Sequence, residues 1–285
     1  MSFIRSFSDS KIAKLTIDQN AETFALLKED VAKGIVFPAV RNERIDFYYL
    51  GGCLYSFGGT FFRDKEWEKF SENTKGLSEY CKAKKQVENK FAKMHGGSAE
   101  RKILNELYSQ TFASNRSSAV VVLDIEISLG KVDDKSQKCD LLLLNTQTDE
   151  IMFVEGKVYS DPRVRSAVGQ KIEVIDQVNA YTTVVERQSE TILAQYAEHV
   201  RILNKLFGTN YNPPKKLLMP VRLLVYETGI GKEVNIRYTV ETVSNVLGAN
   251  NVMWVEREPV VAPSLEQIWA ALTDGSPVNL LNKAV

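Results

Sequence analysis

The stretch EIMFVEGKVYSD, residues 150–161, decides how the rest of the chain is interpreted. Four apolar residues, Ile151–Val154, run directly into Glu155-Gly156-Lys157. The chain places an acidic residue two positions before a lysine five times, but only Glu155 does so at the end of an apolar run. Side chains two apart on a strand point to the same face of a sheet, and burying two charges without compensation costs free energy. The pattern therefore predicts a sheet edge at which Glu155 and Lys157 meet something charged.

A second acidic residue, Asp140, opens the apolar run that precedes this stretch. The runs Cys139–Asn145 and Glu150–Lys157 are joined by the polar segment TQTD, which is typical of a hairpin turn. Such a hairpin brings Asp140 beside Glu155, so that two carboxylates converge next to a lysine. Because two carboxylates repel and hard oxygen ligands suit Mg²⁺ or Mn²⁺, we expect a divalent cation here, with the carbonyl of Gly156 as a further ligand. The alternative is a surface hairpin whose acids and lysine form only a salt bridge.

The composition of the 285-residue chain limits the kinds of protein and of partner that it is compatible with. Lys and Arg together number 36, as do Asp and Glu, so any phosphate-binding surface must be local. No apolar run is long enough to span a bilayer, and the N-terminal segment MSFIRSFSDSK lacks the apolar core of a signal peptide. We therefore expect a cytoplasmic protein with no membrane partner. The three cysteines, Cys53, Cys81 and Cys139, are too scattered for a disulfide framework.

The elements predicted from periodicity fall on either side of Gly96-Gly97, where we place a domain boundary. Residues 1–95 form an expected α+β region, with a helix over 8–33, two or three strands over 35–63 and a charged helical segment over 64–95. Residues 96–285 form the second domain, for which we expect an α/β fold with a mixed sheet and helices on both faces. We expect helices over Ser98–Phe112 (with Ser98 as N-cap), Val164–Glu186, Ser189–Phe207, Tyr238–Leu247 and Ser264–Leu272. We expect strands over Ala119–Leu129, Cys139–Asn145, Glu150–Lys157, 216–227 and 251–258. The order along the chain is thus a helix, three strands, two helices, a strand, a helix, a strand and a closing helix.

Asp140, fourteen intervening residues and Glu155-Gly156-Lys157 resemble the core motif of the PD-(D/E)xK nuclease superfamily. The predicted order of helix, three-stranded meander, helix and strand is similar to that family's core, and the likeness covers roughly residues 96–260. Cys139 stands where the family name has a proline. The resemblance implies a restriction-endonuclease-like mixed sheet flanked by helices. It also implies that Asp140, Glu155 and the Gly156 carbonyl bind the metal ion and that Lys157 is catalytic.

Two further features resemble the RecB-like branch of this superfamily. Gln177 and Tyr181, in the segment QVNAY, lie four apart and so share one face of a helix. They resemble the family's QxxxY element, which implies that both side chains line the site. Family members often carry a metal-supporting glutamate on the first core helix, and the resemblance assigns that role to Glu100. The alternatives are an ordinary polar stripe for Gln177 and Tyr181, and for Glu100 a carboxylate favoured by the helix dipole.

The function implied by the resemblance is that of a metal-dependent nuclease, which hydrolyses phosphodiester bonds in nucleic acid, with DNA favoured. The rival hypothesis is a catalytically silent module of the same fold that serves binding or dimerisation, and a homodimer stays open. The basic segment 82–93 and Lys215-Lys216 could contact phosphates, although a solvated helix face is favoured for the first. The aromatic residues between Tyr48 and Phe62 could stack on bases or form an interface, although packing in a core is favoured.

Overall fold

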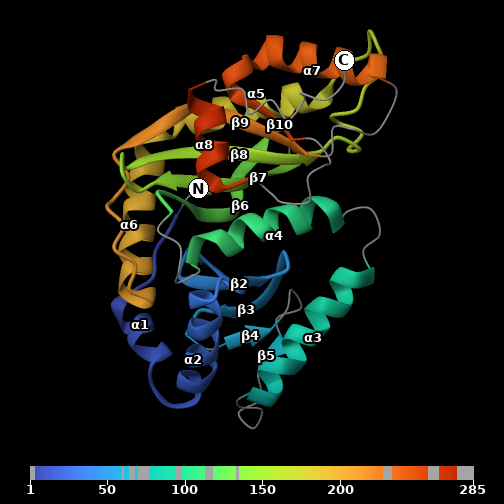
Figure 1. The fold of residues 1–285 in the computed structure, drawn as a ribbon. Helices are drawn as coiled ribbons and strands as arrows, with labels where there is room; N and C mark the ends of the chain where they lie inside the picture. The colour runs from blue at the N-terminus through green and yellow to red at the C-terminus, as the bar shows by residue number, and fades with distance from the viewer. Residues whose placement is uncertain are drawn as a thin grey trace. The chain divides into compact units, whose positions relative to one another are not determined.

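The computed structural model describes residues 4–59, 61–63, 68–69, 77–93, 98–112, 118–132, 135–226, 233–255 and 263–274 (Figure 1). The chain divides into two compact units. Unit 1 contains Ser118–Leu193 and Pro214–Val285 together with Met1–Phe3, and unit 2 contains Ile4–Ser117 and Ala194–Pro213. This division differs from the boundary expected near residue 95.

The sheet of unit 1 is a mixed sheet of five strands in the order β10-β9-β8-β7-β6. Strands β6, β7 and β8 form an antiparallel meander, whereas β9 runs parallel to both β8 and β10. The expected α/β class, with a mixed sheet flanked by helices, is therefore confirmed. The strand bounds are Val120–Val132 (β6), Lys135–Asn145 (β7), Glu150–Val158 (β8), Lys216–Tyr226 (β9) and Val252–Val255 (β10).

The hairpin of β7 and β8 follows from its sequence. Leu141 pairs with Val154 and Leu144 pairs with Ile151, and the four apolar residues of each run are fully buried. Uninterrupted apolar strands of this kind are covered on both faces. In the turn, the side-chain oxygen of Asn145 accepts the N–H groups of the two residues after Thr146. The predicted hairpin, which brings the Asp140 end of β7 beside the Glu155 end of β8, is confirmed.

Helices α5, α7 and α8 pack against this sheet. Helix α5 begins at Glu173 and not at Val164, so the predicted start was wrong. Instead, the backbone N–H of Val164 bonds to the carbonyl of Asp161, and Gly169 adopts a φ of 80°, a turn conformation that a helix does not allow.

The helix bounds are Glu173–Arg187 (α5), Ser189–Phe207 (α6), Glu233–Leu247 (α7) and Leu265–Thr273 (α8). Helix α6 passes from unit 1 to unit 2, and α7 is five residues longer at its start than expected. Helix α8 begins with a capping box at Ser264.

Unit 2 contains an antiparallel sheet in the order β1-β2-β3-β4-β5 and helices α1 to α4. The helix expected over 8–33 is two helices, because Thr16 leaves helical geometry and its hydroxyl bonds to the Ala13 carbonyl. The region predicted as two or three strands contains four. The bounds are Asp9–Leu15 (α1), Asp18–Ala32 (α2), Phe37–Arg41 (β1), Arg44–Tyr49 (β2), Gly52–Phe57 (β3), Phe61–Arg63 (β4), Glu68–Lys69 (β5), Leu77–Lys93 (α3) and Ser98–Phe112 (α4).

Helix α4 has the predicted bounds but packs in unit 2. The ring of Tyr108 lies 5.5 Å from that of Phe37 on β1, which explains why the unit continues beyond residue 95. Ser98 is the first described residue of α4, and its predicted role as N-cap stays a prediction, because its side chain lies outside the described residues. The aromatic side chains of Phe57 and Phe61 are buried with their ring centres 4.8 Å apart, so for these two residues the core-packing alternative is confirmed.

Among the helices that the structure describes, none is both long enough and apolar enough to cross a bilayer.

Candidate active site at the β7–β8 hairpin

Asp140, Glu155 and Lys157 converge at one place in unit 1. The Lys157 ammonium lies 2.6 Å from Oε1 of Glu155 and 3.5 Å from Oδ2 of Asp140. The same ammonium donates to the carbonyl of Gly156 at 2.7 Å, and the N–H of Gly156 donates to Oδ2 of Asp140 at 2.9 Å. The antiparallel pairing of β7 with β8 brings the two acids together, as the sequence predicted.

Two of the three side chains are buried, and that of Asp140 is partly buried. Those of Glu155 and Lys157 are 2% and 3% exposed, and that of Asp140 is 14% exposed. A surface hairpin held by a solvated salt bridge, one of the sequence alternatives, does not fit these values. Burial raises the pKa of the Asp140 carboxyl above its ordinary value, against the lowering effects of the Lys157 charge and the Gly156 N–H. The site thus concentrates negative charge in a place that water reaches poorly.

Gln177 and Tyr181 reach the same site from helix α5. The side-chain amide of Gln177 donates to Oε1 of Glu155 at 2.8 Å and contacts the hydroxyl of Tyr181 at 2.6 Å. Their spacing of four residues places both on the helix face that meets the sheet. Burial and the charge of Glu155 raise the pKa of Tyr181 to about 12, so its hydroxyl stays protonated at neutral pH. Gln177 therefore fixes the orientation of the Glu155 carboxylate.

Of the two other predicted metal ligands, the Gly156 carbonyl and the Glu100 side chain, the structure describes only the first. The Gly156 carbonyl lies beside the acids but accepts a hydrogen bond from Lys157. Glu100 belongs to α4, which is part of unit 2, and its side chain lies outside the described residues. Its predicted role stays a prediction.

Glu126 on β6 is a further acidic residue that sequence reasoning missed. Ile125 pairs with Leu141 and Ile127 pairs with Cys139, so Glu126 lies opposite Asp140. Its negative charge raises the pKa of Asp140 further. Glu126 also has a φ of 50°, which is a strained conformation for a residue with a side chain. Alternation within DIEISL could have indicated Glu126, but the pairing of β6 with β7 was needed to place it opposite Asp140.

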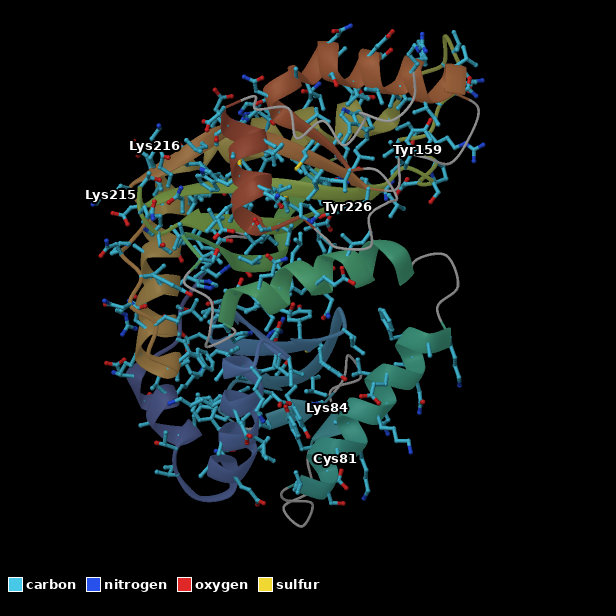
Figure 2. The ribbon with its side chains drawn as sticks, viewed as in Figure 1. Cys81, Lys84, Tyr159, Lys215, Lys216 and Tyr226 are labelled. Carbon is cyan, nitrogen blue, oxygen red and sulfur yellow. The ribbon has the colours of Figure 1, made fainter. Side chains whose placement is uncertain are left out.

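Two of the basic residues that we considered for phosphate binding, Lys215 and Lys216, lie away from this site within unit 1. Lys215 and Lys216 stand at the start of β9, at the opposite end of the sheet from Tyr159 and Tyr226 (Figure 2). Lys216 pairs with Glu150, seven residues before Lys157, which is about 23 Å at the rise of a β-strand. Both lysines form ion pairs there, with Asp149 and Glu150. In segment 82–93, Lys82 and Lys84 pair with Glu79 and Asp30.

The donor set at the site fits a hard divalent cation. Mg²⁺ is commonly held by one or two carboxylates, with water and substrate phosphate as its other ligands, and Asp140 and Glu155 supply such a pair. Within the described ranges, no group of three or more His, Cys, Asp or Glu side chains is arranged to hold a metal ion. A metal ion at Asp140 and Glu155 would therefore need further ligands of another kind, such as water or a substrate phosphate.

Comparisons of the chain with protein-family models, with curated proteins and with solved structures found no match.

Proposed function

We propose that the chain is a divalent-metal-dependent phosphodiester hydrolase that acts on nucleic acid, with DNA as the favoured substrate. The observation that carries this proposal is the convergence of a buried carboxylate, a partly buried carboxylate and a buried ammonium on adjacent strands. Gln177 and Tyr181 support it, because Gln177 donates to Glu155 and to Tyr181 from the helix in which the resemblance to RecB-like nucleases predicted the pair. As part of the same proposal, we infer that the five-stranded sheet of unit 1 is of the restriction-endonuclease-like type.

In the proposed mechanism Asp140 and Glu155 would hold Mg²⁺ or Mn²⁺, with the Gly156 carbonyl as a further ligand. When bound, the ion polarises the phosphoryl group and acidifies water. Lys157 orients the attacking water and stabilises the negative charge that develops on the phosphate. Its ammonium is already fixed in place by the Gly156 carbonyl at 2.7 Å, so little reorganisation is needed. Gln177 keeps the Glu155 carboxylate in one orientation.

A catalytically silent binding or dimerisation module is the second candidate. It is favoured by the direct ion pairs of Lys157 with both acids, which compensate their charge without a metal.

Cleavage assays separate the two candidates. Labelled single-stranded, duplex, nicked and branched DNA, with matching RNA, would be incubated with Mg²⁺, with Mn²⁺ or with a chelator. We expect cleavage of at least one substrate that requires the metal ion and is lost in Lys157→Ala, while Lys216→Ala, which removes a distant ion-paired lysine, cleaves like the wild type. Cleavage that survives Lys157→Ala unchanged would remove the assignment, and no metal-dependent cleavage of any substrate favours the silent module.

A further inference from the structure

Arg163 lies in the turn that connects β8 to α5, close to the carboxylate pair. The carboxylate of Asp161 holds its guanidinium along one edge, with Nε 3.0 Å from Oδ1 and Nη2 2.6 Å from Oδ2. The Arg163 backbone N–H also donates to the Asp161 carboxylate at 2.8 Å, and its carbonyl accepts the N–H of Val174 in α5. The guanidinium plane is therefore fixed before any ligand arrives.

Gln177 links this guanidinium to the carboxylate pair. Nη1 of Arg163 lies 3.5 Å from the side-chain oxygen of Gln177, whose amide nitrogen donates to Glu155. One side chain thus separates the Arg163 cation from the acid that is proposed to bind the metal ion. The Arg163 side chain is 44% exposed, whereas that of Lys157 is 3% exposed, so solvent reaches the first cation and hardly the second.

We propose that Arg163 binds a backbone phosphate of the nucleic-acid substrate and positions the strand at the Asp140–Glu155 pair. This inference rests on the proposed function. A polyanion that approaches two carboxylates is repelled by them, and a fixed cation beside the pair offsets that repulsion. A guanidinium suits this task because its planar donors match the oxygens of a phosphate and because it stays charged at every working pH. Asp161 is 10% exposed and bound to Arg163, so it orients the cation and presents little charge of its own to solvent.

The chain offers a matched control two residues further along the same turn. Arg165 is also exposed, but its neighbour Val164 is buried, which places the two arginines on either side of a residue that anchors the turn. Arg163→Met and Arg165→Met change the net charge by the same amount. Any difference between them therefore reports the position of the guanidinium.

The first measurement is binding of fluorescein-labelled single-stranded and duplex DNA to the full chain in a chelator, by fluorescence anisotropy over a range of salt concentrations. We expect Arg163→Met to bind about 10-fold to 100-fold more weakly than the wild type, as for the loss of a hydrogen bond to a charged group. The slope of log K against log salt should fall by about 0.7 for single strands or 0.9 for duplex. Arg165→Met should stay within about threefold of the wild type, within the scatter of such effects.

The second measurement separates positioning from folding. In steady-state cleavage, Arg163→Met should raise KM by the same factor as it weakens binding, and Arg163→Lys should recover part of that loss because it restores the charge without the planar fork. Equal KM and binding for Arg163→Met and Arg165→Met, in a wild type that cleaves, would overturn this inference and leave the proposed function standing. A wild type that neither binds nor cleaves nucleic acid would overturn both.

Discussion

Replacing Lys157 with methionine tests the electrostatic design of the site. Methionine has a similar length to lysine but no charge, so the variant keeps the volume and removes the ammonium. Its contacts with Glu155, Asp140 and the Gly156 carbonyl, at 2.6, 3.5 and 2.7 Å, are all lost. The buried carboxylate of Glu155 and the partly buried carboxylate of Asp140 are then left without the ammonium. We expect the variant to fold less stably than the wild type at neutral pH.

The expected magnitude follows from burial. Breaking a buried ion pair by removing one partner typically costs about 3–5 kcal/mol, since the remaining charge stays buried. Lys216 offers the control, because its pair with Glu150 has a short distance of 2.8 Å but a lysine that is 65% exposed. Breaking an exposed pair costs about 0–1 kcal/mol. Lys157→Met should therefore lose at least about 2 kcal/mol more than Lys216→Met.

Urea unfolding followed by tryptophan fluorescence measures this difference. Trp254 and Trp269 are buried in unit 1 and report the unfolding of that unit. If the carboxylates bind Mn²⁺, adding the ion should return part of the lost stability, about 2.7 kcal/mol at a hundred times the dissociation constant. Equal losses for Lys157→Met and Lys216→Met would refute the claim that Lys157 compensates the charges of Asp140 and Glu155.

Three further predictions concern other positions. Gln177→Leu removes the bond that orients Glu155 and should lower single-turnover cleavage about 10-fold to 100-fold without unfolding the chain; an unchanged rate would contradict this role. Because burial raises the pKa of Asp140 above 3.8, the stability that its protonated form provides is lost as pH rises through the folded pKa. The Asp140→Asn variant has no titrating group at this position. We therefore expect its free energy of unfolding, relative to that of the wild type, to rise between pH 4 and pH 7 by about 1.4 kcal/mol for each unit by which the pKa of Asp140 is raised. Parallel pH profiles of the two proteins would disprove this. Gly34→Ala should destabilise unit 2 by about 1–3 kcal/mol in thermal melts, because φ is 71° and a Cβ would lie 2.3 Å from the Ser109 carbonyl oxygen; Gly208→Ala, with a φ of 69° and open space, should cost less.

Local patterns predicted the centre of the candidate site. The apolar runs before Asn145 and after Glu150, with a polar turn between them, indicated the hairpin, and the hairpin alone places Asp140 beside Glu155. Spacing of four residues was enough to put Gln177 and Tyr181 on one helix face. Each of these inferences uses contacts within a single element or between adjacent ones.

What the sequence did not reveal depends on contacts between distant segments. Glu126 faces Asp140 only through a β6–β7 pairing that contains two register shifts, and no pattern in the sequence marks where those shifts occur. The start of α5 was placed too early because Asp161 forms a turn with Arg163 and Val164 in place of helical bonds. The compact units divide at a different place from the predicted boundary, because α4 packs its aromatic residues on β1.

Manganese binding tests the central claim, that Asp140 and Glu155 together hold a divalent ion. The electron paramagnetic resonance signal of free Mn²⁺ disappears on binding, so titrating the full chain counts the bound ions directly. We predict that the wild type binds Mn²⁺ and that Asp140→Asn and Glu155→Gln each lose this binding while their urea unfolding stays cooperative. Equal binding by the wild type and both variants, or no binding by the wild type, would contradict the account.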